Sequence, residues 1–283
     1  MKSILLPTDF SKNSWNAIQY ALKFFEKSNC NFYLLHVTKL NDLVSVDTSY
    51  ITTQEAIEEV QTKLAKKQLR LLLKQISEKL PNNKKHKFYA LTDYNFFIES
   101  IRNHVNEKKI DMIVMGTKGA SGLKKYIIGS NTGDVITKVA CTTLVVPENA
   151  KFTNITEVAF PTDLSISYHI QTLLPISDIL EEFHSDLRIL HISKKTEDLN
   201  EDQQKYKELL EDYFNNNNFS FHFLTNKNIE DAVQCFVQSR DIDMIAMVAK
   251  NLNYFQRILF LPTIEEISYH TDVPFLVLHE QQN

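Results

Sequence analysis

Short runs of apolar residues alternate along this chain with longer stretches in which apolar side chains recur every three or four positions. The apolar runs are typical of buried β-strands and lie at residues 3–7, 32–37, 87–91, 112–115 and 143–146. The longer stretches predict helices at residues 11–26, 53–80, 96–105 and 130–139, with Ser11 able to cap the first and Pro81 ending the second. Strands that alternate with helices predict a parallel sheet covered by helices on both faces.

The same pattern occurs twice. The segment "ILLPTDFS" (residues 4–11) returns as "VAFPTDLS" (158–165), "NFYLLHVTK" (31–39) as "DLRILHISK" (186–194), "KIDMIVMG" (109–116) as "DIDMIAMV" (241–248), and "TTLVVPE" (142–148) as "PFLVLHE" (274–280). The second half therefore predicts strands at residues 155–161, 187–192, 220–224, 244–248 and 275–278. We interpret the chain as a tandem duplication with domains at residues 1–149 and 155–283.

The glycines are concentrated in one segment. The chain has five, all in "GTKGASGLKKYIIGSNTG" (residues 116–133), although average usage of about 7 % would give roughly twenty. Gly116 and Gly119 follow the predicted strand 112–115, and Gly129-Ser130 opens a helical pattern. Glycine lets a backbone approach a ligand closely, and a helix N-terminus attracts anions. The segment therefore predicts a phosphate site; a flexible loop followed by an ordinary serine cap is the alternative.

Polar groups around this helix start fit the same chemistry. Ser130 and Thr132 supply hydroxyls, Asn131 supplies an amide, and Lys118, Lys124 and Lys125 supply positive charge. The spacings of the P-loop and of the dinucleotide-binding fingerprint are both absent.

Ligands of open parallel sheets bind beyond the carboxyl ends of the strands. Three stretches are expected to converge there: Pro7-Thr8-Asp9, His36-Val37-Thr38 and the glycine segment. Asp9 could instead be an acidic residue at a helix N-terminus, and His36 is expected to be a packed or capping histidine rather than a catalyst. The connector at residues 41–52 occurs only in the first half, as a surface loop or a lid.

These motifs together resemble the universal stress protein family, over the whole chain as two units. The resemblance implies two five-stranded Rossmann-like sheets in the order 3-2-1-4-5, paired through their fifth strands as a pseudo-dimer within one chain. It also implies ATP with Mg²⁺ as ligand, the metal being held through the phosphates and the Ser130 hydroxyl being a further candidate. Asp9 and Val37 would hold the adenosine, with Pro7 and Thr8 alongside and Met115 and Gly116 at the ribose. The phosphates would be held by Gly119, Gly129, Ser130, Asn131 and Thr132.

The second unit departs from this pattern. With "IDMI" in register, Gly116 becomes Val248, Gly119 becomes Asn251, Gly129 becomes Leu261 and Ser130 becomes Pro262, whereas Asp163 is kept. Proline lacks the N–H that a phosphate site needs. We expect one nucleotide per chain, in the first domain. The apolar stretch at residues 252–262 is interpreted as core packing or as a contact surface.

The expected function is that of a nucleotide-dependent regulator in a stress response. A slow ATPase or nucleotidyl-transfer enzyme and a ligand-free adaptor remain alternatives. No catalytic triad, metal-spaced histidine pair or zinc motif is present in the sequence, so hydrolysis is expected to be slow or absent. The sequence does not separate ATP from ADP, AMP or a cyclic nucleotide.

Composition excludes other classes. A net charge of −4 argues against nucleic acid, and no apolar run approaches the ~20 residues of a membrane span. Three unpaired cysteines and an early Pro7 favour the cytoplasm over secretion. An unidentified protein partner is expected, and the sequence leaves open whether two tandem chains pair further into a homodimer.

Overall fold

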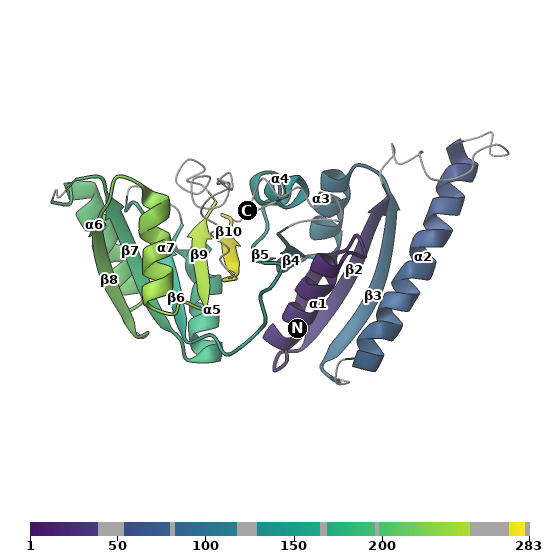
Figure 1. Ribbon diagram of the computed structural model, residues 1–283, viewed down its shortest axis with the longest axis horizontal. Helices are drawn as coiled ribbons and strands as arrows, with labels where there is room; N and C mark the ends of the chain where they lie inside the picture. Colours follow the sequence, from purple (N-terminus) through teal and green to yellow (C-terminus); the bar gives the residue numbers. More distant parts are fainter. Residues whose placement is uncertain are drawn as a thin grey trace.

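The computed structural model describes residues 1–38, 54–79, 83–117, 129–164, 169–195, 198–249 and 272–280. Its strands form one ten-stranded sheet in the order β3-β2-β1-β4-β5-β10-β9-β6-β7-β8, with helices on both faces (Figure 1). The order reads as two five-stranded halves that meet at β5 and β10. The predicted connector at residues 41–52 and the apolar stretch at 252–262 lie outside the described residues.

The first unit supplies five parallel strands in the order 3-2-1-4-5, as predicted. They are β1 (Lys2–Pro7), β2 (Cys30–Thr38), β3 (His86–Tyr94), β4 (Met112–Gly116) and β5 (Thr143–Val146). Successive side chains of a strand point to opposite faces. Ile4 and Leu6 therefore pack against α1 (Lys12–Phe24) and α2 (Gln54–Lys79), whereas Leu5 packs against α3 (Phe97–Lys108) and α4 (Ser130–Lys138).

The second unit repeats this arrangement. Its strands are β6 (Glu157–Pro161), β7 (Asp186–Ser193), β8 (Phe219–Thr225), β9 (Met244–Val248) and β10 (Phe275–Leu278), again in the order 3-2-1-4-5. One face is covered by η2 (Ile170–Leu173), α5 (Leu174–Phe183) and α6 (Glu201–Tyr213), and α7 (Ile229–Ser239) covers the other. The predicted fold of two tandem doubly wound sheets is confirmed.

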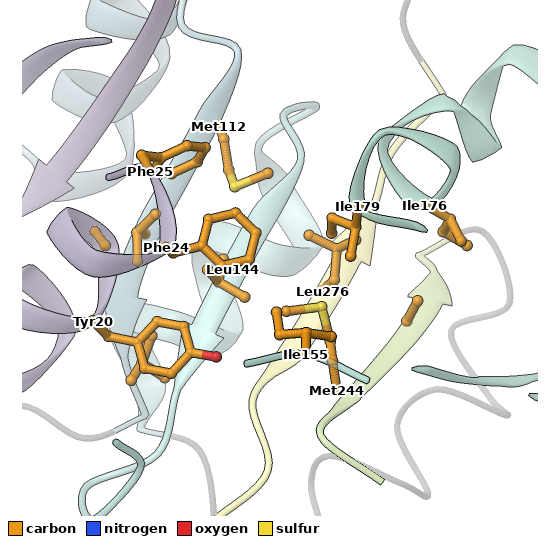
Figure 2. Close-up of a cluster of buried hydrophobic side chains, with 14 of the residues drawn as sticks. Tyr20, Phe24, Phe25, Met112, Leu144, Ile155, Ile176, Ile179, Met244 and Leu276 are labelled. Carbon is orange, nitrogen blue, oxygen red and sulfur yellow. The ribbon is translucent and has the colours of Figure 1, made fainter. Parts of the chain in front are cut away.

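The two units join through their fifth strands. β5 and β10 pair antiparallel, with Phe275 opposite Val145 and Leu276 opposite Leu144. Beside this seam, Figure 2 shows side chains of both units meeting in one apolar cluster, among them Phe24 from the first and Ile179 from the second. The Phe24 and Phe183 rings lie 5.2 Å apart between centroids. The pairing buries both fifth-strand edges, so the chain is the predicted pseudo-dimer within one polypeptide.

Most element boundaries agree with the pattern of apolar residues, with one informative difference. Ser11 caps α1 as predicted, since its hydroxyl accepts a hydrogen bond from Ser14 N at 3.2 Å. Ser130 is not a cap: α4 begins at Ser130 itself, and Gly129 holds the extended N-cap conformation. None of the described helices is long and apolar enough to cross a membrane.

Candidate functional site

The turn that joins β1 to α1 is held by its own side chains. Phe10 has a φ of 62°, in the left-handed region that non-glycine residues seldom adopt. Its N–H donates to the Thr8 hydroxyl at 3.1 Å, and Ser11 N donates to the Asp9 carboxylate at 3.0 Å. These bonds stabilise the unusual backbone and leave Asp9 exposed at the carboxyl edge of the sheet.

His36 supports this turn from the neighbouring strand. Its Nδ1 lies 2.8 Å from the Thr8 carbonyl oxygen, and its ring packs 4.5 Å from the Phe10 ring between centroids. The packing role expected of His36 is the one that the structure shows. Val37, one residue further along β2, is partly buried and pairs with Asp93 of β3.

Gly116, at the end of β4, packs closely against the first turn of α1. A Cβ on Gly116 would lie 3.1 Å from the backbone oxygen of Asn13 and 3.3 Å from its carbonyl carbon. A side chain at position 116 would therefore require the first turn of α1 to shift by a few tenths of an ångström. Met115, just before it, is 6 % exposed and faces the core rather than solvent.

The first turn of α4 docks onto the same strand end. The Gly129 N–H donates to the Thr117 carbonyl, and the Thr132 hydroxyl donates to the Gly116 carbonyl at 2.8 Å. Ser130 and Asn131 are exposed, and the N-cap residue, Gly129, has no side chain that could cap this N-terminus. The N–H groups of a first helical turn have no partner within the helix, and the helix dipole makes that end positive.

The sheet order brings these parts together, because β1 is the neighbour of β4. Pro7, Thr8 and Asp9 thus share one edge with Gly116 and with the start of α4, and Val37 lies one strand further away. Gly119 and Lys118, Lys124 and Lys125 lie outside the described residues. Sequence reasoning missed Phe10 and Asn13; the repeat of "PTDFS" as "PTDLS" was the available signal for a specialised turn.

The second unit has the same turn after its first strand, β6, but the residues around that turn differ from those of the first unit. Leu164 has a φ of 55°, and His191 Nδ1 lies 3.1 Å from the Thr162 carbonyl oxygen, as at Phe10 and His36. Here, however, the Gln203 side chain donates to the Asp163 carbonyl at 3.1 Å. Val248 stands where the first unit has Gly116. Asn251, Leu261 and Pro262 lie outside the described residues.

The described part of the site offers no cluster of three histidine, cysteine or acidic side chains that could hold a metal ion. Asp134, in the first turns of α4, lies 2.7 Å from the Lys138 ammonium group.

The strand order in each half shows that this is a doubly wound α/β protein made of two tandem units. The residues above meet at the carboxyl edge of the first unit. The model of the universal stress protein family matches residues 1–147, so this chain belongs to the universal stress protein family.

Two curated relatives come from Methanocaldococcus jannaschii. Universal stress protein MJ0577 is 29 % identical over 160 residues, which cover 51 % of this chain and 94 % of the relative. Universal stress protein MJ0531 is 27 % identical over 150 residues, covering 53 % and 84 %. A universal stress protein from Archaeoglobus fulgidus is similar in structure over 99 % of this chain and 98 % of its own, with a TM-score of 0.70 at 18 % identity. That last similarity concerns the fold alone.

Proposed function

We propose that this protein is a nucleotide-dependent regulator in a stress response, and that its first domain (residues 1–149) binds one adenine nucleotide, ATP with Mg²⁺. The observation that carries this proposal is the N-terminus of α4. Its N-cap residue, Gly129, has no side chain that could cap it, and Thr132 anchors it beside the exposed turn that bears Asp9.

The phosphates fit the start of α4. Ser130 and Asn131 are exposed residues at the positive end of a helix, and their N–H groups and the Ser130 hydroxyl are donors that a phosphate could use. The extended Gly129 lets phosphate oxygens come close to the backbone. Mg²⁺ prefers oxygen ligands and keeps much of its hydration, so it would be bound through the phosphates, with the Ser130 hydroxyl in reach as a further ligand. Gly119 is proposed to belong to the same phosphate site, from its place in the glycine segment of the sequence.

The adenine fits the backbone of β2. The Leu35 carbonyl accepts a hydrogen bond from Thr8 N, on the β1 side, and the Thr38 carbonyl accepts one from Asn95 N, on the β3 side. Backbone groups of successive residues in a parallel strand point to alternate sides. The N–H and C=O of Val37 therefore point towards the β1 side of β2. β1 ends at Pro7, which lies opposite Leu35, so it does not extend as far along β2 as Val37. A donor and an acceptor there match the Watson–Crick edge of adenine.

The ribose falls between these two ends. Asp9 would accept hydrogen bonds from the sugar hydroxyls, with Pro7, Thr8, Met115 and Gly116 shaping the floor by their backbone. Nucleotide bound here would bridge the β1–α1 turn and α4, and so change the surface that an unidentified protein partner meets.

The second unit is proposed to lack a nucleotide. Gln203 of α6 already binds the backbone of the turn at Asp163, and Val248 brings a side chain to the position of Gly116. This unit would instead act as a permanent partner that closes the edge of β5.

The test is to count nucleotide on the purified chain. The protein is denatured without added ligand, and the supernatant is analysed by ion-pair chromatography; about one adenine nucleotide per chain is expected. Two per chain would refute the single site, and none after soaking with Mg-ATP would refute the proposal.

The variant Ser130→Pro sharpens this test. Proline is well tolerated at the first position of a helix, and the extended Gly129 suits the residue before it. The substitution removes one N–H and one hydroxyl from the phosphate site without disturbing α4. Bound nucleotide should fall to a small fraction while the unfolding midpoint stays close to that of the parent.

A further inference from the structure

A pocket of about 310 Å³ separates the start of α1 from the middle of α2, on the helix-covered face that lies away from α4. Its walls carry side chains that the nucleotide proposal does not use: Lys12, Trp15, Gln68, Leu71, Leu72 and Gln75. The four α2 residues are spaced i, i+3, i+4 and i+7, so they form one stripe along that helix.

The walls suit a flat apolar body. Trp15 of α1 lines the pocket with its indole, and Leu71 and the largely buried Leu72 line it from α2. Leu71 is 58 % exposed, so a ligand that covered it would bury apolar surface. A planar ring between the indole and the two leucines would bury this surface and stack as aromatic rings prefer. The Gln68 and Gln75 amides flank the leucines and can bind polar substituents at either end.

The positive charge at the pocket favours ligands that carry a negative charge. Lys12 is in its lining, and the Lys79 ammonium group lies 5.9 Å from the centre of the Trp15 ring. The lining residues that the structure describes include no aspartate or glutamate. An anionic substituent would meet the positive charge of Lys12 and Lys79.

We propose that this α1–α2 pocket binds a small planar aromatic anion, such as an aryl carboxylate. A volume of about 310 Å³ lies at the lower end of the range for small-molecule sites and fits a molecule of few rings. Thr8 and Ser14, whose hydroxyls are 3.1 Å apart, form the inner wall, which is the reverse side of the turn that presents Asp9. The pocket is proposed as a second site, although Thr8, Phe10 and Ser11 of its lining belong to the turn that presents Asp9.

Trp15 provides the measurement, because it is the only tryptophan in the chain. Its single indole N–H resonance is followed during titration of the full-length protein with 1-naphthoate and with the neutral 1-naphthalenemethanol. We expect a saturable shift with one site per chain, and binding of the carboxylate about two- to fivefold tighter than that of the alcohol. The Lys12→Gln variant should remove most of that preference.

Two leucines of α2 give a matched pair of variants. Leu71→Glu places a carboxylate in the pocket and should weaken 1-naphthoate at least about tenfold. Leu64→Glu makes the same change two turns earlier, at a side chain that is 48 % exposed and outside the lining, and should leave the affinity unchanged. Ser130→Pro should also leave it unchanged, which separates this site from the nucleotide site.

Three results would overturn the proposal. One is a Trp15 resonance that does not shift in a saturable manner. Another is an equal loss of 1-naphthoate binding in Leu64→Glu and Leu71→Glu. The third is a dimer in sedimentation velocity that Leu71→Glu dissociates, which would assign the exposed leucine to a second copy of the chain.

Discussion

The Thr132 hydroxyl donates a hydrogen bond to the Gly116 carbonyl oxygen at 2.8 Å, and Thr132 is 3 % exposed. This buried bond joins the first turn of α4 to the last residue of β4. Thr132 was expected to hold phosphate directly, and its hydroxyl is instead directed at the protein. Its contribution to a nucleotide site would be to fix where the N–H groups of Ser130 and Asn131 lie.

Thr132→Val tests this positioning role. The variant keeps the side-chain shape but leaves the Gly116 carbonyl without its donor, so we expect a loss of about 1–2 kcal/mol in unfolding free energy. Affinity for Mg-ATP should fall about tenfold, because the first turn of α4 is no longer held in place. Urea denaturation and calorimetric titration measure the two effects.

Thr137→Val is the matched control on the same helix. The Thr137 hydroxyl donates to the Gly133 carbonyl of its own helix at 2.8 Å, away from the strand end. Affinity should stay within about twofold of the parent, since nothing that positions the phosphate site is removed. Similar affinity losses in both variants would show that the bond to Gly116 has no special role.

Gly116→Ala tests the close approach of α1 to β4. The added Cβ would lie 3.1 Å from the Asn13 oxygen, a backbone atom, so the first turn of α1 must shift. We expect a loss of about 1–3 kcal/mol in unfolding free energy and weaker nucleotide binding, since the β1–α1 turn moves with the helix. Asn13→Ala should not rescue the variant, because the two shortest contacts involve the Asn13 backbone. Unchanged stability in urea would contradict the packing reason for this glycine.

Sequence patterns predicted the buried strands best. β5, β9 and β10 match the predicted ranges residue for residue, because central strands covered on both faces read as unbroken apolar runs. β3 was predicted at residues 87–91 but spans His86–Tyr94. Pairing with β2, as between Thr38 and Tyr94, extends it through polar residues that carry no apolar signal.

The site was predictable as a location and less so as a set of contacts. Asp9, Gly116 and Gly129 could be placed at one edge from strand order alone. The Thr132–Gly116 bond and the approach of Asn13 could not, because both depend on how α1 and α4 dock onto the sheet. The helix was predicted to open at Ser130, as it does, and the alternative of a serine cap there is wrong because the N-cap falls at Gly129, where the backbone is extended.

Asp9 and Asp163 allow the single-site proposal to be tested within one molecule. Asp9→Asn keeps an oxygen that can accept from Ser11 N, so the turn should persist while the charge is lost. We expect affinity for Mg-ATP to fall about tenfold or more. Asp163→Asn makes the same change in the second unit and should alter the affinity by less than about twofold. Equal effects in calorimetric titrations would mean that both units bind nucleotide.

A histidine of the second unit contributes to the surroundings of α4. His279 follows β10 and hydrogen-bonds to the backbone of Ile136 in α4, and Ile136 packs in an apolar cluster with Phe275 and Val277. Burial lowers the pKa of His279 to about 4 from an ordinary 6.5, and its Nε2 is buried without a partner among the described residues. The junction therefore holds this imidazole in its neutral form, next to the helix that bears the proposed phosphate site.

This pKa predicts how stability depends on pH. Below about pH 6.5, His279 is protonated in the unfolded chain but stays neutral in the folded chain. The free energy of unfolding therefore decreases as the pH falls towards about 4. The shift of the His279 pKa corresponds to about 3 kcal/mol of unfolding free energy. This stability is fully present above pH 6.5 and is lost as the pH falls from 6.5 to about 4. Urea denaturation over this range measures it, and His279→Gln should flatten the pH dependence by that amount. His169→Gln, at a side chain that is 80 % exposed, should leave it unchanged. If His279→Gln also left the profile unchanged, His279 would titrate in the folded protein as it does in water, and the junction would not exclude the proton.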